Sequence, residues 1–317
     1  MAAKRVLITG ASGFIGRALC RELALRGFDV VALARDPGAV LGRLPGGVVA
    51  AAWDGRTDRG WRRLADGALA IVNLAGESLA EGRWTEAKKE RILRSRVDAG
   101  AAVIQAVRAA GTRPAVIIQA SAIGAYGDRG DEELDESSSA GTGFLAGTVK
   151  AWEASTEEAG SLGVRRAIIR SGLVLGRDGG VWPRLAMPFR FFAGGPIGGG
   201  RQWFSWISLE DEVRAIRFLI ERSDLEGIFN LTAPRPLRQR ELCRVMGRAL
   251  GRPCWMPVPG FALKALFGRM AEETLLAGQR VAPRRLLAAG YEFLRPDAEA
   301  AVAALAGLRR TPRAGYP

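Results

Sequence analysis

The stretch Val6-Leu7-Ile8-Thr9-Gly10-Ala11-Ser12-Gly13-Phe14-Ile15-Gly16 decides the fold of this chain. Its first three residues form a short apolar run, as expected for a strand that is buried on both faces of a parallel sheet. Three glycines follow at once. Gly10 lets the chain turn tightly, Gly13 has no side chain to block a pyrophosphate, and Gly16 lets the next helix pack close to the strand. The stretch therefore predicts a dinucleotide-binding loop.

The segments that follow supply the context that such a loop requires. A helical pattern runs from Phe14 to Arg26, and a second apolar run at 30–34 is typical of the next strand. The start of that helix would point unpaired N–H groups and the positive end of its dipole at the phosphates. The loop residues that we expect to contact the cofactor are Thr9, Gly10, Ser12, Gly13, Phe14, Ile15 and Gly16.

The end of the second strand distinguishes the two nicotinamide dinucleotides. In this kind of fold an acidic residue there holds the ribose hydroxyls of NAD, whereas an arginine suits the 2′-phosphate of NADP. Ala34 stands where the acidic residue of an NAD site is expected, and Arg35 follows it. Asp36 supports the alternative, because its carboxylate could bind the ribose. We expect NADP(H) in preference to NAD, with Arg35 as a cofactor ligand.

Two further strand ends add candidate cofactor contacts. The run 48–53 predicts a third strand that ends in Asp54, at a position near the adenine. The run 70–74 predicts a fourth strand that leads into a glycine turn. Ligands of doubly wound sheets bind outside the carboxyl ends of the strands. The candidate contacts at these two ends are Asp54, Leu74, Ala75, Gly76 and Glu77.

Strands and helices continue to alternate through the first half of the chain. A helix expected at 85–110 is followed by a strand at 115–120, a helix at 144–162 and a strand at 166–171. The acidic segment 128–139 is too polar for a core and predicts a surface loop. The alternation predicts an α/β fold with a Rossmann-type doubly wound parallel sheet and right-handed crossovers.

The pattern changes after residue 172, where glycine-rich loops separate short helices. This texture predicts a small, mainly helical C-terminal lobe. We expect a cofactor-binding domain over 1–172 and a substrate lobe and helical domain over 173–317. The segment 200–233 is expected to contribute back to the first domain.

Composition narrows the classes of partner. The formal net charge is +13, but the arginines are spread along the chain without a basic tail, so we expect no nucleic-acid partner. No apolar run reaches the roughly 18 residues that a membrane span needs, and we expect no membrane partner. The first strand leaves no room for a signal peptide, which favours a cytoplasmic protein. A homo-oligomer stays possible.

The residues that could supply catalysis or metal binding are few. Histidine is absent, which excludes imidazole acid–base work and histidine metal ligands. Cys20, Cys243 and Cys254 show no paired spacing, so we expect neither a disulfide nor a zinc site. Proton transfer must therefore use another side chain, and no metal is expected.

Taken together, these motifs resemble the extended, epimerase-like branch of the short-chain dehydrogenase/reductase superfamily, and within it a YfcH-type group. Thr-Gly-x-x-Gly-Phe-Ile-Gly at 9–16 is similar to the superfamily motif. The resemblance to the group rests on the segments 73–77, 83–85, 95–96, 121–127, 200–207, 230–234 and 278–281. It implies a Rossmann cofactor domain, NADP(H) and a small-molecule substrate that is undefined for most members. Some members carry a cell-division-inhibitor label. The match also implies that Glu77 and Trp84 lie over the nicotinamide pocket.

The chain departs from the superfamily at the proton donor. Ordinary members use Tyr-x-x-x-Lys on the helix after the fifth strand, with a Ser at the end of that strand. Ser121 matches the Ser, but Leu145 and Val149 hold the positions of the Tyr and the Lys. Shifting the alignment by one residue offers the pairs Phe144 and Thr148, or Ala146 and Lys150. Leucine or phenylalanine cannot transfer a proton, so the usual mechanism does not apply.

Three functions stay open at this point. The first is an NADP-dependent oxidoreductase in which Tyr126 or Ser121 gives the proton and Lys150 helps to hold the ribose. The second is a sensor or scaffold that binds NADP(H) without turnover, and the third is an interaction protein in cell division. Arg170 and Arg201 could clamp an anionic substrate or form structural ion pairs.

Overall fold

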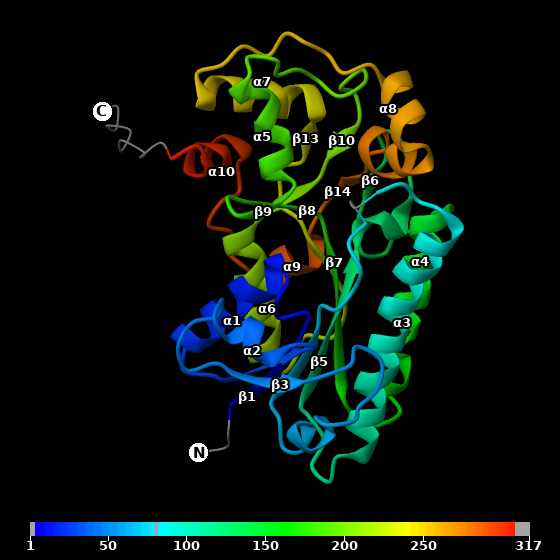
Figure 1. The fold of residues 1–317 in the computed structure, drawn as a ribbon, viewed down its shortest axis with the longest axis vertical. Coiled ribbons are helices and arrows are strands. Elements are labelled where there is room, and N and C mark those ends of the chain that lie inside the picture. The colour runs from blue at the N-terminus through cyan, green and yellow to red at the C-terminus, as the bar shows by residue number, and fades with distance from the viewer. Residues whose placement is uncertain (1–3, 80–81, 308–317) are drawn as a thin grey trace.

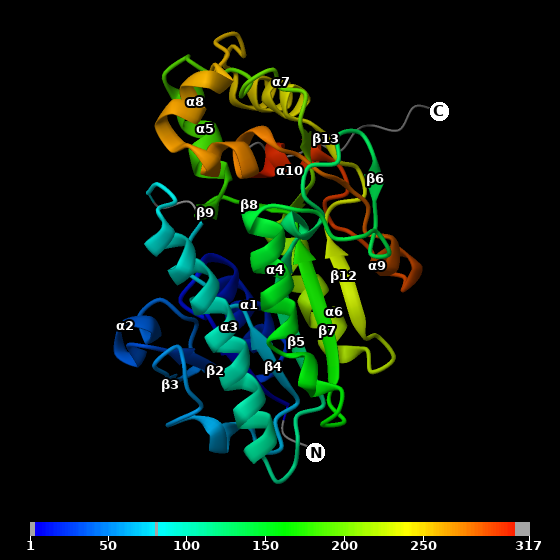
Figure 2. The same cartoon turned by 90° about the vertical axis from the view of Figure 1, so that its right-hand side faces the viewer.

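The computed structural model describes residues 4–79 and 82–307. Its centre is a seven-stranded parallel sheet in the order β12-β7-β5-β4-β1-β2-β3 (Figures 1 and 2). The strands are β1 (Arg5–Thr9), β2 (Asp29–Ala34), β3 (Val49–Ala52), β4 (Ala70–Asn73), β5 (Val116–Ala122), β7 (Arg165–Ser171) and β12 (Gly227–Leu231). The chain builds outward from β1 in one direction and then in the other. The switch point therefore lies between β1 and β4, and the predicted doubly wound α/β fold is confirmed.

Helices cover both faces of this sheet. On one face lie α1 (Phe14–Leu25) and α6 (Leu209–Glu221), and on the other α3 (Glu86–Ala109) and α4 (Phe144–Ala154) (Figures 1 and 2). The short α2 (Pro37–Leu41) follows β2. Three 3₁₀ turns span Arg62–Ala65, Ile123–Tyr126 and Glu157–Ala159. The helix expected to reach residue 162 is shorter than predicted, because α4 ends at Ala154 and the last 3₁₀ turn is separate from it.

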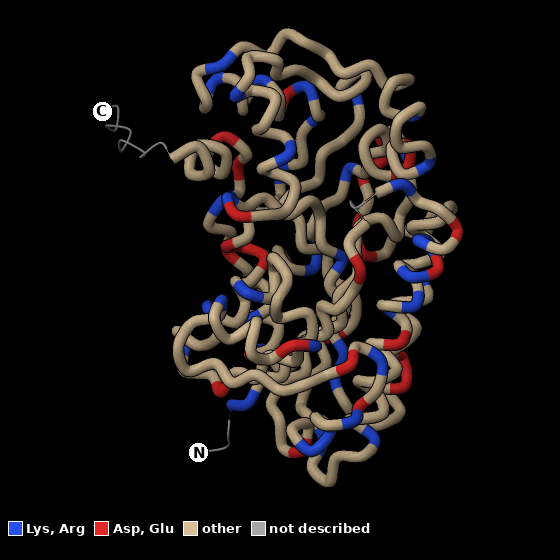
Figure 3. The backbone as a smooth tube through the Cα atoms, in the orientation of Figure 1, with Lys and Arg blue, Asp and Glu red and all other residues tan. Residues whose placement is uncertain are grey.

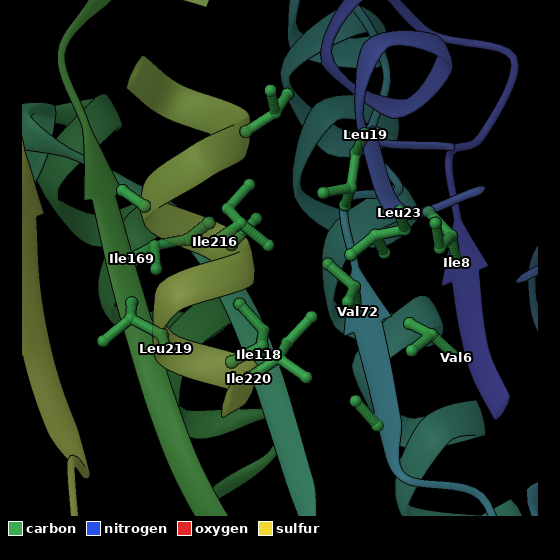
Figure 4. Close-up of a cluster of buried hydrophobic side chains, with 14 of the residues drawn as sticks. Val6, Ile8, Leu19, Leu23, Val72, Ile118, Ile169, Ile216, Leu219 and Ile220 are labelled. Carbon is green, nitrogen blue, oxygen red and sulfur yellow. The ribbon is translucent and has the colours of Figure 1, made fainter. Parts of the chain in front are cut away.

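The strands are apolar because both faces of the sheet are buried. Figure 4 shows one face of the sheet, where strand side chains pack against side chains of α1 and α6. The strands contribute Val6, Ile8, Val72, Ile118 and Ile169, and the helices contribute Leu19, Leu23, Ile216 and Leu219. Successive side chains of a strand point to opposite faces. Leu7, Ile71 and Ile117 accordingly join a second buried cluster with α3.

The chain beyond β7 forms a smaller lobe over the carboxyl ends of the strands (Figure 1). Its helices are α5 (Trp182–Arg190), α7 (Gln239–Leu250), α8 (Gly260–Phe267), a π-helical turn (Ala271–Leu276) and α10 (Ala298–Leu305). The short α9 (Arg284–Ala288) lies instead beside β12, and its Leu286 belongs to the core of the main sheet. Its short strands are β8 (Leu173–Gly176), β9 (Gly179–Gly180), β10 (Trp203–Phe204), β11 (Trp206–Ser208) and β13 (Leu237–Arg238). Trp182, Phe189, Trp206 and Leu242 belong to a separate core of this lobe.

The segment 200–233 does return to the main sheet. Its helix α6 covers one face, and β12 pairs with β7 at the edge. The boundaries of the two predicted domains stay predictions, and the end of the second one, beyond residue 307, lies outside the described residues.

The acidic segment 128–139 is not only a surface loop, as its polarity predicted. It contains β6 (Glu133–Leu134), which pairs in parallel with β14 (Arg280–Val281) of the C-terminal part. Leu134 is fully buried in a small cluster with Ile123, Tyr126 and Val281. The prediction was wrong here because one buried leucine among many charged residues leaves no periodic signal.

The cysteine prediction was also wrong in part. A disulfide joins Cys243 of α7 to Cys254 in the loop after it, while Cys20 is a buried free thiol. The Cα atoms of the pair lie 6.3 Å apart, within the range that a disulfide spans. The pair was not predicted because a separation of 11 residues is not a recognised disulfide or zinc spacing. The turn after α7 brings the two cysteines together.

Charge is distributed over the whole molecule. Figure 3 shows lysine and arginine interspersed with acidic residues over both the sheet domain and the smaller lobe. Among the described residues no helix is long and apolar enough to cross a membrane.

Candidate cofactor site

The glycine loop after β1 is shaped by close backbone contacts. Gly10 has a φ of +66°, and a β-carbon there would lie 2.8 Å from the backbone carbon of Leu74. The N–H of Gly13 donates to the carbonyl of Gly10 at 2.9 Å. A β-carbon at Gly16 would lie only 2.2 Å from that same carbonyl oxygen. The three glycines therefore bring the strand, the loop and α1 together so tightly that a side chain would force them apart.

The start of α1 leaves its N–H groups available. Gly13 is the N-cap and makes no side-chain cap, and the first turn holds no acidic residue. Ser12 and Gly13 are exposed. Arg17 lies in this first turn and donates to the carbonyl of Ser12 at 2.6 Å. The helix dipole and this guanidinium both favour an anion at the loop. We did not predict a role for Arg17, although a basic residue directly after Gly16 was a signal for it.

The Thr9 side chain is buried under the glycine loop and positions the neighbouring backbone. It is fully buried, and its hydroxyl donates to Oδ1 of Asn73 at 2.7 Å. The same hydroxyl oxygen accepts from the N–H groups of Leu74 and Ala75 at 3.0 and 3.2 Å. Thr9 thus connects the end of β1 to the loop after β4, at the switch point where the strand order of the sheet reverses.

Phe14 points toward the smaller lobe. A β-carbon at Gly176, Gly179 or Gly180 would lie within 3 Å of its ring atoms. The hairpin of β8 and β9 therefore lacks side chains where the ring packs. The ring of Phe14 joins the two parts of the molecule, while only its backbone belongs to the phosphate loop.

Arg35 and Asp36, at the end of β2, differ in their contacts. Oδ1 of Asp36 accepts from the N–H of Ala39 at 3.0 Å, so this carboxylate caps α2. Arg35 is exposed, and within the described residues it has no hydrogen bond or ion pair. The competing acidic ligand is thus engaged, and the arginine is free to meet a phosphate.

Asp54 also serves its own loop. One carboxylate oxygen accepts from the N–H groups of Arg56 and Thr57 at 2.8 Å, and the other accepts from the Thr57 hydroxyl at 2.7 Å. The side chain is exposed at the end of β3. Its predicted contact with the adenine end of the cofactor stays a prediction.

Glu77, in the loop after β4, is surrounded by basic side chains. Its Oε1 accepts from Nζ of Lys88 at 2.7 Å and from Nε of Arg91 at 3.3 Å. The hydrogen bond from Lys88 is the main reason why the pKa of Glu77 lies below its usual value. Arg96 donates to the backbone carbonyl of Glu77 at 3.1 Å, and burial lowers its pKa to about 10. By binding Glu77, these cations fix the loop that also carries the exposed Gly76. In this structure the Glu77 side chain therefore positions the loop.

Ser121 faces the α4 side of the sheet. Its hydroxyl donates to Oε1 of Glu153 at 2.5 Å. Arg170 donates to both oxygens of the same carboxylate at 2.8 and 2.9 Å, and only 8% of its side chain is exposed. Of the two alternatives for Arg170, the structure shows the ion pair. Ser121, Glu153 and Arg170 therefore form one buried polar group.

Tyr126 lies in the core. It is fully buried, its hydroxyl donates to Oδ1 of Asn230 at 2.8 Å, and the Arg170 guanidinium lies 4.9 Å from its ring centre. Burial raises the pKa of this phenol above its usual value, which makes it a poorer proton donor. Its predicted role as the acid stays a prediction, and the geometry shows a structural role.

On α4, the helix after β5, the apolar residues Leu145 and Val149 hold the positions expected for the Tyr and the Lys. Leu145 lies against Gly124, where a β-carbon would be 3.6 Å from that of the leucine. Lys150 is exposed further along α4 and has no partner within the described residues. Trp84 meets Phe144 edge to face at 5.1 Å, beside the start of this helix. Among the described residues no cluster of acidic or cysteine side chains could hold a metal ion.

The aromatic run after the lobe's glycine loop is structural. Nε1 of Trp203 donates to Asp131 at 2.8 Å, and the ring lies under Arg238 at 4.1 Å. Trp206 is fully buried. Arg201 is exposed and offers no defined pocket.

A doubly wound parallel sheet with this glycine loop at its carboxyl edge defines the class of proteins that bind nicotinamide dinucleotides. The model of the NAD dependent epimerase/dehydratase family matches residues 6–232, and the chain belongs to that family. A second model, a domain of unknown function (DUF1731), matches residues 258–305.

Several relatives match over nearly the whole chain. The Arabidopsis thaliana protein "Epimerase family protein SDR39U1 homolog, chloroplastic" is 38% identical over 294 residues, which covers 91% of this chain and 82% of the relative. The Bacillus subtilis epimerase family protein YfhF is 33% identical over 316 residues, covering 96% and 99%. The crystal structure of human epimerase family protein SDR39U1 with NADPH superposes with a TM-score of 0.86 at 33% identity, covering 96% and 99%.

The comparisons confirm the resemblance at the level of the epimerase-like family. A Thermus thermophilus UDP-glucose 4-epimerase in complex with NAD, 19% identical with a TM-score of 0.72, shows the shared fold alone. The narrower YfcH-type assignment and the link to cell division stay predictions. So does the cytoplasmic location, since one relative is described as chloroplastic.

Proposed function

We propose that this protein binds NADPH along the carboxyl edge of its parallel sheet and exchanges hydride with a small molecule. The observation that carries the proposal is the free, exposed Arg35 beside an Asp36 whose carboxylate caps α2. A guanidinium binds a 2′-phosphate well, and NADH has no such group. The human relative of 33% identity was crystallised with NADPH, which supports the same choice.

Different residues of the chain would bind different parts of the cofactor. The open N–H groups at the start of α1, with Arg17, would hold the pyrophosphate, and Arg35 would hold the 2′-phosphate. The backbone of Leu74, Ala75 and Gly76 would lie beside the cofactor at the switch point. When bound, the cofactor supplies hydride, and the smaller lobe excludes water from the edge. Substrate would enter between this edge and the lobe.

A second candidate is a sensor or scaffold that binds NADPH without turnover. It is favoured by Leu145 in the position of the usual proton donor and by the buried hydroxyl of Tyr126. Both candidates share the cofactor and differ in chemistry, so binding must be tested before turnover.

Binding is tested by titrating the purified protein with NADPH and with NADH, following nicotinamide fluorescence. We expect NADPH to bind more tightly and Arg35→Ala to weaken NADPH by roughly 10- to 100-fold, the worth of a charge-assisted contact, while NADH changes little. Arg113→Ala is the matched control, because Arg113 is exposed at the opposite edge of the sheet.

Equal affinities for the two cofactors, or an Arg35→Ala variant that behaves like the control, would contradict the proposal. A screen of carbonyl compounds for NADPH oxidation then separates the two candidates. Turnover supports the oxidoreductase, and tight binding without turnover supports the sensor.

A further inference from the structure

Glu212 of α6 is a buried acid that the proposed function does not use. None of its surface is exposed. Its Oε1 accepts a hydrogen bond from the Ser171 hydroxyl at 2.6 Å, and its Oε2 is buried with no hydrogen-bond partner among the described residues. Because a lone buried carboxylate is costly, burial raises its pKa to about 8, and at neutral pH the group is mostly a carboxylic acid.

The Ser171–Glu212 pair lies at the carboxyl edge of the sheet. Ser171 ends β7 and stands in register with Ala122 of β5 and Leu231 of β12. Ile169 faces α6 in Figure 4, and side chains alternate, so Ser171 points to the same face. Glu212 lies one turn before Ile216 on that helix, at the end nearest this edge. Ser171 is only partly buried, while Gly172 after it packs closely under the Ser205 carbonyl, 2.7 Å from where a β-carbon would lie.

The nicotinamide of a bound cofactor belongs at this part of the edge. The pyrophosphate site is at the start of α1, and Arg35 at the end of β2 draws the adenosine in one direction along the sheet. The nicotinamide must then extend the other way, over the ends of β4, β5 and β7. Ser171 ends β7, and Glu212 lies directly behind it.

Other charges are directed away from Glu212. The strands β5, β8 and β11 carry no charged residue. Arg165, Arg166 and Arg170 of β7 bind elsewhere, the last of them with Glu153 on the opposite face.

The charged residues of the two neighbouring helices are also engaged or exposed. On α1, Arg17 donates to the Ser12 carbonyl, Arg21 is exposed, and Glu22 pairs with Arg217 of α6. On α6, Asp211 accepts from the N–H groups of Leu294 and Arg295, Glu210 pairs with Arg295, Arg214 lies beside Tyr291, and Glu221 pairs with Arg217. The state of Glu212 therefore depends on burial, on Ser171 and on whatever lies at the edge.

We propose that the Ser171–Glu212 pair sets the protein's preference between oxidised and reduced NADP. This inference rests on the proposed function. The oxidised nicotinamide carries a positive charge, which favours the carboxylate of Glu212, whereas the reduced ring is neutral and favours the carboxylic acid. Binding of NADP⁺ then releases the Glu212 proton to solvent, and binding of NADPH does not. The protein prefers NADPH in mildly acidic solution and accepts NADP⁺ better as the pH rises.

The test compares the dissociation constants of NADP⁺ and NADPH between pH 6 and pH 8.5, using fluorescence and calorimetry without any substrate. Both nucleotides carry the same 2′-phosphate, so its own titration cancels in the ratio Kd(NADP⁺)/Kd(NADPH). We expect this ratio to fall as the pH rises, by up to about tenfold per pH unit where one proton is released. Calorimetry in buffers of different ionisation enthalpy should show proton release with NADP⁺ alone.

Variants assign the effect to the pair. Glu212→Gln keeps the size of the side chain and removes the proton, so its ratio should not change with pH. Ser171→Ala removes the one hydrogen bond that favours the carboxylate and should move the pH dependence upward. Glu221→Gln, on the same helix and exposed, should behave like the unaltered protein.

The outcomes separate the two proposals. A ratio that is flat with pH, or that changes equally in Glu212→Gln, overturns this inference and leaves the proposed function standing. Failure to bind either nucleotide overturns the proposed function, and this inference with it.

Discussion

The two ends of the carboxyl edge differ in how their side chains are used. At the end formed by β1 and β2, Arg35 is exposed and has no partner within 4–79 and 82–307, and the first turn of α1 carries no acidic residue. At the end formed by β5 and β7, Ser121 and Arg170 are bound to Glu153, and the Tyr126 hydroxyl is bound to Asn230. We call the first the open end, because its binding groups are unpaired among the described residues, and the second the closed end, because its polar side chains are paired within the protein.

This difference separates binding from chemistry. The open end needs only backbone N–H groups and one cation to hold a phosphorylated cofactor, and all of them are present. The closed end holds Ser121 and Tyr126, the predicted proton donors, whose hydroxyls in this structure are bound to Glu153 and Asn230. Their catalytic roles stay predictions.

The largest expected effect is at the centre of the closed end. Glu153→Gln would leave the Arg170 guanidinium buried without its carboxylate, which should lower the free energy of unfolding by about 3–5 kcal/mol. Urea denaturation measures the change. Glu158→Gln is the control, because the Glu158–Arg108 pair is exposed and should contribute less than about 1 kcal/mol. Equal losses in the two variants would show that the closed end is not held by this ion pair.

Glu212 should make stability depend on pH. Its pKa is raised from the unfolded value, near 4.5, to about 8 in the folded protein, so the unfolded chain loses this proton first as the pH rises. The contribution of the protonated group is complete below pH 4.5 and is lost progressively up to pH 8, by roughly 3 to 5 kcal/mol. Glu212→Gln should therefore be more stable relative to the unaltered protein at pH 8 than at pH 5.

Urea denaturation at the two pH values measures that difference. The exposed Glu221→Gln should show no such dependence. A Glu212→Gln variant with the same relative stability at both pH values would mean that Glu212 is already ionised in the folded protein.

The smallest expected effect is at Tyr126. Tyr126→Phe removes the hydrogen bond to Asn230 and should cost about 1 kcal/mol of stability, with NADPH affinity unchanged. Thermal unfolding and the fluorescence titration measure both quantities. Loss of turnover in a variant that folds and binds normally would instead identify Tyr126 as the acid and open the closed end to chemistry.

Local sequence patterns were sufficient for most of the fold. The apolar runs of β1, β2 and β4 were recognised because a strand buried on both faces needs an uninterrupted set of apolar residues. The loop 10–16 was recognised from the spacing of its glycines. Gly13 and Gly16 meet nearby backbone, whereas Gly10 makes room for the distant backbone of Leu74. Asp36 left two interpretations of the cofactor site, and the contact that it makes in the structure, its cap on α2, is also local.

The errors came from contacts between distant segments. Leu134 pairs its strand with residues 280–281, and Cys243 meets Cys254 after a turn that the spacing did not reveal. The hydrogen bond of Ser121 to Glu153 was also not foreseen, because the two residues lie 32 positions apart; the catalytic role of Ser121 stays a prediction. Arg17 was missed, although its position directly after Gly16 was visible.

The sequence by itself determined the order of strands and helices, the dinucleotide loop and the loss of the Tyr-x-x-x-Lys pair. These follow from residue type and short spacing, which act over one turn or one strand. The tertiary structure alone decided which polar side chains are free. Whether Arg170 meets a ligand or Glu153, and whether Glu212 carries a charge or a proton, depends on burial and on partners from distant segments, and neither is encoded in a local pattern.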